Sequence, residues 1–313
     1  MTAWKILLTD GLEENGVSVL RQSAQVDDRP GISADELLTI IGDYDALIVR
    51  GRTKVTQAVL DAGKNLKVVG RSGVGVDNID LKAAKGCGVA VVNAPVATTL
   101  AVAELTFGMM LGMVREIPRA DASMKAGKWL KKELEGSELY GKTLGIIGYG
   151  RIGAAVGRRA AAFDMKVVAY DPLLSADQIR ERGADPASLD EVYQQADLIT
   201  VHVPLTDQTH GMLGSEAFGK MKKGVRIVCA ARGGVIDESA LLAALESGQV
   251  AGAALDVFAT EPPGDSALVK HARVIATPHV GAQTVEAQQR AAADISAEVL
   301  AALRGDPLRW KVA

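Results

Sequence analysis

Cysteine is scarce in this chain of 313 residues, which contains only Cys87 and Cys229. Two thiols so far apart in the sequence do not make the disulfide framework of a small secreted protein or a cysteine-based metal cluster. We therefore expect reduced thiols, a cytoplasmic location and no bound metal.

A strong excess of charge and long apolar runs are also missing. Lys and Arg total 35 and Asp and Glu total 38, so the formal net charge is −3. A chain without a basic excess has no broad electrostatic attraction to nucleic acid or to an acidic membrane surface. The apolar stretches are too short to span a bilayer, and we identify no signal peptide and no short repeat.

The chain is instead rich in apolar residues (48%) and in glycine (33 residues), as soluble α/β proteins are. Its length indicates about two domains. In the first ninety-odd residues, short apolar runs alternate with helix-like stretches, and this alternation predicts a parallel sheet covered by helices. The predicted strands there are Lys5–Leu8, Ala46–Val49, Leu66–Val69 and Val89–Val92.

A helix that is apolar nearly all round is predicted over Thr99–Arg115. Such a helix is buried, either inside one subunit or in a subunit interface. A second α/β unit begins at Lys142, and its later strands are predicted at Leu198–Val201, Val225–Cys229, Ala251–Val257 and Val274–Ala276. We expect a last helix, near Val285–Leu303, to return to the first domain. The expected fold is therefore two Rossmann- or flavodoxin-like domains, residues 1–94 with 285–313 and residues 95–284, and a cleft between them.

Three glycines, Gly148, Gly150 and Gly153, have the spacing G-x-G-x-x-G between a predicted strand and a predicted helix. They permit a tight turn, the approach of a pyrophosphate to the backbone and close packing of helix on strand. The next strand, Lys166–Tyr170, ends at Asp171, where a carboxylate accepts hydrogen bonds from an adenosine ribose and repels a 2′-phosphate. This unit predicts NAD as the cofactor, and the alternative is an ordinary glycine turn.

Reactive side chains follow three of the later strands, namely Arg232, Glu261 and His279. Ligands of an open parallel sheet bind beyond the carboxyl ends of its strands. An arginine holds a carboxylate through two hydrogen bonds, a histidine transfers a proton near neutral pH, and a glutamate orients that histidine. The trio predicts hydride transfer at a 2-hydroxy acid. The other histidines are interpreted as structural or surface residues, although His202 could instead line the cofactor site.

The sequence resembles the D-2-hydroxyacid dehydrogenase family, most closely its phosphoglycerate dehydrogenase branch, over essentially the whole chain. The resemblance rests on residues 49–56, 69–78, 141–148, 231–238, 253–258 and 278–282. It implies Arg232 as the substrate anchor, Glu261 as the partner of the histidine and His279 as the proton donor.

The resemblance also implies contacts to substrate and cofactor. The substrate contacts are expected from Arg50, Arg52, Ser72, Gly73 and Lys131. The NAD contacts are expected from Val74, Gly148, Gly150, Arg151, Ile152, Gly153, Asp171, Val203, Ala230, Ala231, Asp256, Gly281 and Ala282, with Asp256 at the nicotinamide carboxamide.

The activity that the resemblance implies is oxidation of D-3-phosphoglycerate to 3-phosphohydroxypyruvate, at the start of serine synthesis. It also implies a homodimer formed through the second domain, with a tetramer left open. Because the chain stops at Ala313, we expect no regulatory domain. Departures from the branch around the substrate, at Gly51, Thr98 and Lys131, keep open a reductase of hydroxypyruvate, glyoxylate or another small 2-keto acid. An NAD(H)-sensing scaffold similar to some corepressors is a third alternative.

Overall fold

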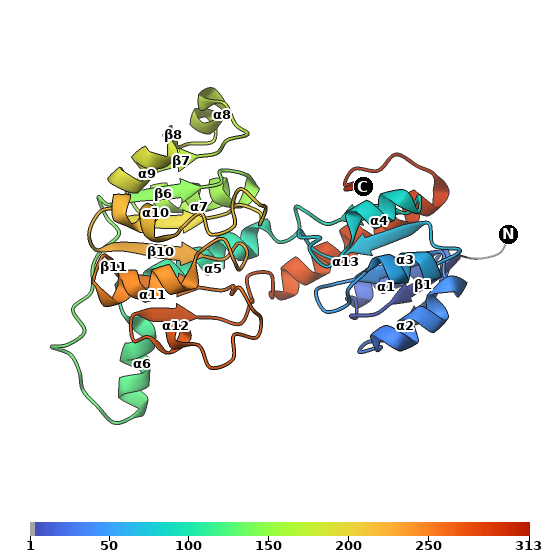
Figure 1. The fold of residues 1–313 in the computed structure, drawn as a ribbon, viewed down its shortest axis with the longest axis horizontal. Coiled ribbons are helices and arrows are strands. Elements are labelled where there is room, and N and C mark those ends of the chain that lie inside the picture. The colour runs from blue at the N-terminus through green and yellow to red at the C-terminus, as the bar shows by residue number, and fades with distance from the viewer. Residues whose placement is uncertain (1–3) are drawn as a thin grey trace. The chain divides into compact units, whose positions relative to one another are not determined.

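The computed structural model describes residues 4–313, and the chain forms two compact units (Figure 1). Unit 1 consists of residues 4–99 and 282–313, and unit 2 consists of residues 100–281. Each unit has its own parallel sheet with helices on both faces. The predicted α/β class with two parallel sheets is therefore confirmed.

Unit 1 is built around a five-stranded parallel sheet in the order β2-β1-β3-β4-β5. Alternate residues of each strand point to opposite faces, and both faces are apolar, as a sheet covered on both sides requires. Ile6 and Leu8 pack under α1 and α13, whereas Leu7 and Leu47 pack under α2, α3 and α4. The strands are β1 (Trp4–Leu8), β2 (Ala24–Asp28), β3 (Ala46–Val49), β4 (Val68–Arg71) and β5 (Ala90–Asn93), and the helices are α1 (Glu14–Arg21), α2 (Ala34–Ile40), α3 (Gln57–Ala62), α4 (Leu81–Gly86) and α13 (Val285–Arg304).

Unit 2 contains a seven-stranded parallel sheet in the order β12-β11-β10-β9-β6-β7-β8. The strand order reverses between β6 and β9, and an open α/β sheet binds its ligand at such a switch point. The strands are β6 (Thr143–Ile147), β7 (Lys166–Tyr170), β8 (Asp185–Pro186), β9 (Leu198–Val201), β10 (Val225–Cys229), β11 (Val250–Leu255) and β12 (Val274–Ala276).

Two groups of helices cover this second sheet. One face carries α9 (Leu189–Gln195), α10 (Ser215–Lys220), α11 (Glu238–Glu246) and α12 (Ala267–Lys270). The other face carries α5 (Thr99–Val114), α7 (Arg151–Ala161) and α8 (Ala176–Glu181). Phe107 and Met110 of the apolar helix α5 lie in one core with Leu144 and Ile146 of β6, so this helix is buried within its own unit. Among the described residues, no helix is both long and apolar enough to cross a membrane.

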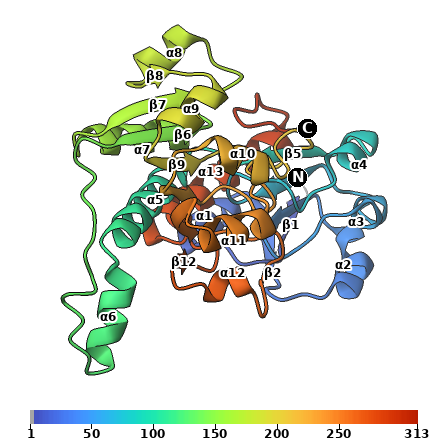
Figure 2. The ribbon, with the colours of Figure 1, turned by 60° about the vertical axis from the view of Figure 1, so that its left-hand side comes forward.

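Helix α6 (Ile117–Lys125) and the segment after it extend away from the sheet of unit 2 (Figure 2). This segment, residues 126–142, has turns but no further helix or strand. Two of its large apolar side chains are exposed, Trp129 at 76% and Tyr140 at 71%, whereas Leu139 is buried. We name α6 and residues 126–142 together the arm.

The structure adds elements that the sequence pattern did not predict. The strands β2 and β8 lie at sheet edges, and their residues are only partly buried, so they lack the apolar runs that mark the central strands. Helix α8 begins with a capping box in which Ser175 and Gln178 bond each other's backbone, a signal that is present in the sequence. The other predicted strands are found with ends shifted by at most two residues, which is the usual uncertainty of such boundaries.

Candidate active site

The glycine turn after β6 is shaped for close approach by a ligand. Gly148 has φ +88°, and a Cβ there would lie 2.7 Å from the carbonyl oxygen of His202. A Cβ on Gly153 would lie 2.2 Å from the carbonyl oxygen of Gly148. A Cβ on Gly150, in contrast, would meet open space, and Gly150 precedes the first turn of α7, whose backbone N–H groups have no side-chain cap. The turn therefore fits a pyrophosphate held on a helix N-terminus.

Asp171 directly follows β7 and lies against this turn. Its Oδ2 accepts a hydrogen bond from the backbone N–H of Tyr149 at 2.8 Å, and its Oδ1 accepts one from the N–H of Leu173 at 2.9 Å. A carboxylate offers about four lone-pair sites, so two remain for ribose hydroxyls. The role of Asp171 at the ribose thus stays a prediction with a suitable geometry.

Replacing Gly153 with alanine should therefore damage the cofactor turn. The new Cβ would force β6 and α7 apart, because the oxygen that it meets belongs to the backbone and cannot swing away. We expect the NADH dissociation constant to rise about tenfold or more and the melting temperature to fall by several degrees. Fluorescence titration and thermal unfolding measure both quantities. Gly219→Ala in α10, where a Cβ meets nothing within 4 Å, is the matched control, and an unchanged NADH affinity in Gly153→Ala would contradict the assignment.

His202 follows β9 beside the glycine turn. Its Nε2 lies 3.0 Å from Oγ1 of Thr200, and its Nδ1 is buried without a hydrogen-bond partner among residues 4–313. Burial lowers the pKa of His202 from 6.5 to about 4, so the ring is neutral at physiological pH. A neutral ring is no ready proton donor, and both interpretations of His202, as a structural residue or as part of the cofactor site, stay predictions.

The lowered pKa makes a prediction about acid stability. The unfolded chain protonates His202 below about pH 6.5, but the folded chain does so only near pH 4, so the contribution is complete above pH 6.5 and is lost as the pH falls towards 4. Between pH 7 and pH 4.5 the loss amounts to about 2 kcal/mol. Urea unfolding at these two pH values should show a smaller drop for His202→Gln than for the parent chain. His271→Gln is the control, and equal drops in His202→Gln and the parent would refute the prediction.

His279 and Glu261, which follow β12 and β11, form the candidate acid–base pair. Nδ1 of His279 lies 2.8 Å from Oε2 of Glu261, and Oε1 of Glu261 accepts a hydrogen bond from the backbone N–H of Phe258 at 3.1 Å. With Nδ1 bonded to the carboxylate, Nε2 is left to exchange a proton with a ligand. The histidine side chain is 49% exposed, so a ligand can reach it.

Asp256, at the end of β11, builds the turn that carries His279. The residue is 1% exposed. Its Oδ1 accepts hydrogen bonds from Oγ1 of Thr277 at 2.6 Å and from the N–H of Val280 at 2.8 Å, and its Oδ2 accepts one from the N–H of Gly281 at 2.8 Å. These bonds hold His279 in a backbone conformation with φ +53°, which is rare for a residue other than glycine. The sequence did not predict this positioning role. A carboxylate offers about four lone-pair sites, and three of those of Asp256 are used here, so the predicted contact with the carboxamide would use the remaining one.

Arg232 lies in the loop between β10 and α11. A Cβ on the adjacent Gly233 would lie 1.8 Å from the carbonyl oxygen of Phe258, so this loop packs directly on the loop that leads to Glu261. The residue is half-buried, and its Nη1 donates to the carbonyl oxygen of Ala231 at 2.6 Å. The strands β10, β11 and β12 are neighbours in the sheet, so the loops with Arg232, Glu261 and His279 follow adjacent strands.

Cys229, the last residue of β10, is a buried free thiol. Burial raises its pKa to about 11, so the thiol stays protonated and unreactive at neutral pH.

The remaining predicted residues divide between the two units. Arg151, Ile152, Val203, Ala230 and Gly281 flank the carboxyl ends of the strands of unit 2, and Lys131 is exposed on the arm. The residues of unit 1 are Arg50, Arg52, Ser72, Gly73, Val74 and Ala282.

Within unit 1, Gly73 has φ +142°, and the guanidinium of Arg71 lies where its Cβ would be, so this position requires glycine. Ser72 is buried, and its N–H donates to the carbonyl oxygen of Val49 at 2.9 Å. The carbonyl oxygen of Val74 accepts a hydrogen bond from Nδ2 of Asn93 at 2.6 Å. These contacts fix the loop after β4. The predicted ligand contacts of Ser72, Gly73 and Val74 stay predictions.

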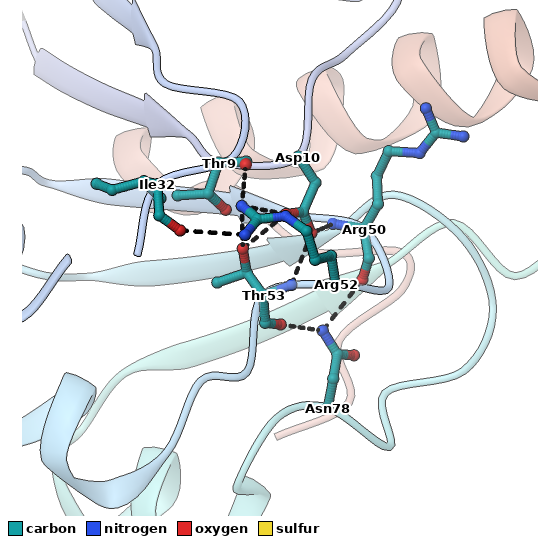
Figure 3. A network of polar contacts seen from close by, with 7 residues as sticks. All are labelled: Thr9, Asp10, Ile32, Arg50, Arg52, Thr53 and Asn78. Atoms are coloured by element: carbon teal, nitrogen blue, oxygen red, sulfur yellow. Dashed lines mark hydrogen bonds and ion pairs between the residues drawn. The ribbon is translucent and has the colours of Figure 1, made fainter. Parts of the chain in front are cut away.

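The two arginines of the loop after β3 have different surroundings (Figure 3). Arg52 contacts Thr9, Asp10, Ile32 and Thr53, whereas Arg50 contacts the side-chain oxygens of two glutamines. The sequence predicted the same role for both, and it carried no signal for the contacts that separate them.

Known proteins are similar to this chain in sequence and in structure. D-3-phosphoglycerate dehydrogenase of Rattus norvegicus is 49% identical over 305 residues, which cover 97% of this chain and 57% of that protein. The chain thus spans a little over half the length of this curated relative. A glyoxylate reductase from Paecilomyes thermophila superposes with a TM-score of 0.92 at 31% identity, covering 100% of this chain and 99% of that one.

D-lactate dehydrogenase from Aquifex aeolicus, solved as a complex with NAD and lactic acid, superposes with a TM-score of 0.83 at 31% identity and covers 96% of each chain. The family model described as "D-isomer specific 2-hydroxyacid dehydrogenase, NAD binding domain" matches residues 107–281. This match spans nearly all of unit 2, with its glycine turn and its His279–Glu261 pair. The chain therefore belongs to the D-isomer specific 2-hydroxyacid dehydrogenase family, and unit 2 carries that family's NAD-binding domain.

Proposed function

We propose that this chain oxidises D-3-phosphoglycerate to 3-phosphohydroxypyruvate with NAD, the first step of serine synthesis. The observation that carries the proposal is the His279–Glu261 pair at 2.8 Å, one loop away from Arg232 on the NAD-binding domain. The identity of 49% to a D-3-phosphoglycerate dehydrogenase supports the choice of substrate.

The roles of the residues follow from their chemistry. Arg232 binds the carboxylate of the substrate through its planar guanidinium and so orients the neighbouring carbon. Nε2 of His279 takes the proton of the 2-hydroxyl group, and the Glu261 carboxylate stabilises the imidazolium that forms. NAD, when bound on the glycine turn, supplies the acceptor of the hydride that leaves carbon 2. In the reverse direction, His279 returns the proton to the keto oxygen.

A second substrate class is favoured by a specific observation. Arg52 is occupied by contacts inside unit 1, so less positive charge is left for a phosphate than the sequence suggested. A reductase of glyoxylate or hydroxypyruvate needs no such charge, and the superposition on a glyoxylate reductase agrees with it.

The first experiment compares substrates with purified protein. NADH oxidation is followed with 3-phosphohydroxypyruvate beside hydroxypyruvate, glyoxylate, pyruvate and oxaloacetate. We expect kcat/KM to favour the phosphorylated acid by about a hundredfold or more, which corresponds to about 2.7 kcal/mol of transition-state binding. A preference for an unphosphorylated acid would keep the dehydrogenase and reject the phosphoglycerate assignment, and NADH binding without turnover of any acid would reject the enzyme.

The proposal includes a homodimer formed through unit 2. The arm exposes Ile117 (54%), Met124 (56%), Trp129 and Tyr140, and apolar side chains gathered on an extended segment are typical of a subunit contact. Light scattering measures the mass in solution, and a monomer would contradict the dimer.

We further propose a reducing compartment such as the cytoplasm, because Cys87 and Cys229 are both free thiols.

A further inference from the structure

Arg50 and Arg52 flank Gly51 in the loop after β3, and their guanidinium groups have partners of different charge: that of Arg52 bonds to backbone carbonyl oxygens and a carboxylate, whereas that of Arg50 bonds to neutral side-chain amides. Nη1 of Arg52 donates to the carbonyl oxygen of Ile32 at 3.1 Å, and its Nη2 donates to the carbonyl oxygen of Thr9 at 2.7 Å. The same Nη2 lies 3.2 Å from Oδ1 of Asp10. Both terminal nitrogens of the Arg52 guanidinium are thus bonded within unit 1.

Asp10 fixes this loop through hydrogen bonds that its carboxylate accepts from residues of the loop. Its side chain is 4% exposed, although that of Arg52 is 50% exposed. Oδ2 of Asp10 accepts hydrogen bonds from the N–H of Arg50 at 2.8 Å and from the N–H of Thr53 at 3.1 Å, and Oδ1 accepts one from the hydroxyl of Thr53 at 2.6 Å. A buried carboxylate is stable only when its oxygens are bonded in this way, so the loop and Asp10 depend on each other.

Asn78 fixes the opposite side of the same loop. Its Nδ2 donates to the carbonyl oxygens of Arg50 at 3.0 Å and of Thr53 at 2.6 Å. The peptide groups of Arg50 are therefore bonded on both the N–H and the carbonyl side. This leaves the backbone of Arg50 little freedom.

The side chain of Arg50 extends away from this network (Figure 3). Its Nη2 donates to Oε1 of Gln283, at 3.2 Å, and to Oε1 of Gln288. Amide oxygens are neutral, and among residues 4–313 no carboxylate pairs with this guanidinium. Arg50 therefore keeps an uncompensated charge and a planar fork, which suit an anionic group that offers two oxygens.

We propose that Asp10 and Arg52 are positioning residues that present Arg50 alone to the phosphate of the substrate. The inference rests on the proposed function and deepens it, because it assigns different roles to two arginines that the sequence does not distinguish. Arg52 stabilises the loop through Asp10, and Arg50 contacts the anion. Removing Arg52 then acts on the phosphate only through Arg50.

Steady-state kinetics of single and double variants of the full chain test this division. KM and kcat are measured with 3-phosphohydroxypyruvate and with its unphosphorylated analogue hydroxypyruvate. Arg50→Met should raise KM for the phosphorylated acid about tenfold or more and change KM for hydroxypyruvate much less. Arg52→Met and Asp10→Asn should shift the ratio of the two KM values in the same direction with kcat nearly unchanged, and Arg52→Lys should recover part of the loss.

The double variant gives the sharpest result. If Arg52 acts through Arg50, the KM ratio of Arg50→Met/Arg52→Met equals that of Arg50→Met, whereas two direct contacts would multiply their effects. Multiplied effects would overturn the proposal. Lys54→Met is the matched control, because it removes an exposed charge from the same loop without touching the network, and the melting temperature of every variant shows that it is folded.

Three further outcomes show whether this inference and the proposed function stand or fall together. If Arg50→Met lowers the discrimination but Arg52→Met and Asp10→Asn do not, the positioning role is wrong and the phosphoglycerate assignment stands. If Arg50→Met leaves the KM ratio unchanged, Arg50 does not bind the phosphate, and the positioning role falls with it. If the parent chain does not discriminate between the two acids at all, the proposed substrate is rejected together with this inference.

Discussion

Replacing His279 with alanine is expected to lower kcat for keto-acid reduction by about a hundredfold or more, equivalent to about 2.7 kcal/mol in the barrier. The ring is bonded to Glu261 through Nδ1 at 2.8 Å, and it is the group in the proposed site that can deliver a proton to the keto oxygen. NADH affinity should change little, because the glycine turn and Asp171 do not contact the ring. Stopped-flow reduction and fluorescence titration measure the two quantities.

Two controls sharpen this result. His271→Ala removes a histidine whose Nδ1 only accepts a hydrogen bond from the N–H of Arg273, and its kcat should stay near that of the parent. Glu261→Gln keeps the shape of the carboxylate without its charge, and its effect should not multiply with that of His279→Ala, because the two groups act as one unit. An unchanged kcat in His279→Ala would remove the acid–base assignment.

Replacing Arg232 with alanine is expected to lower kcat/KM by about a hundredfold or more, through loss of substrate binding and orientation. A guanidinium that holds the carboxylate by two hydrogen bonds also fixes the angle at which the neighbouring carbon meets the cofactor. Arg232→Lys keeps the charge but not the fork, so it should recover only part of this loss. The measurement is a substrate titration at saturating NADH, for each acid that the parent chain accepts.

Arg226→Ala provides the matched comparison for Arg232. This arginine lies on the same strand β10, and its Nη2 donates to Oγ of Ser137 at 3.4 Å, away from the carboxyl end of the strand. Its loss should leave kcat/KM within about twofold of the parent. Should Arg232→Ala retain both KM and kcat, the substrate-anchor role would be wrong.

The central strands were predictable because each is a short apolar run bounded by polar residues or glycine. The edge strands β2 and β8 were not, since β2 (Ala24–Asp28) pairs with one neighbour and leaves its polar side chains partly exposed, whereas the edge strands β5 and β12 are apolar runs and were predicted. The family was also readable from the sequence, and the match over residues 107–281 confirms it. The domain boundaries and the individual ligand contacts stay predictions.

The candidate site residues were predictable to different degrees. In unit 2, Arg232, Glu261 and His279 each follow a predicted strand, and parallel strands bring their carboxyl ends to one edge. The role of Asp256 in the His279 turn was not predictable, because it depends on hydrogen bonds to residues more than twenty positions away. The only signal in the sequence was a single aspartate within the predicted apolar strand Ala251–Val257.

The sequence by itself determined the fold class, the cofactor turn and the choice of candidate reacting residues, because these follow from local periodicity, glycine spacing and the chemistry of single side chains. Only the tertiary structure shows that two neighbouring arginines have different partners, with Arg52 beside a carboxylate and Arg50 beside neutral amides. Arg50 and Arg52 are two residues apart and have the same side chain. They differ in partners that are distant in the sequence, such as Thr9, which bonds to Arg52 from 43 positions away. Such partners meet because parallel strands align the ends of β1 and β3, and side-chain hydrogen bonds then form wherever the folded backbone brings donor and acceptor within about 3 Å.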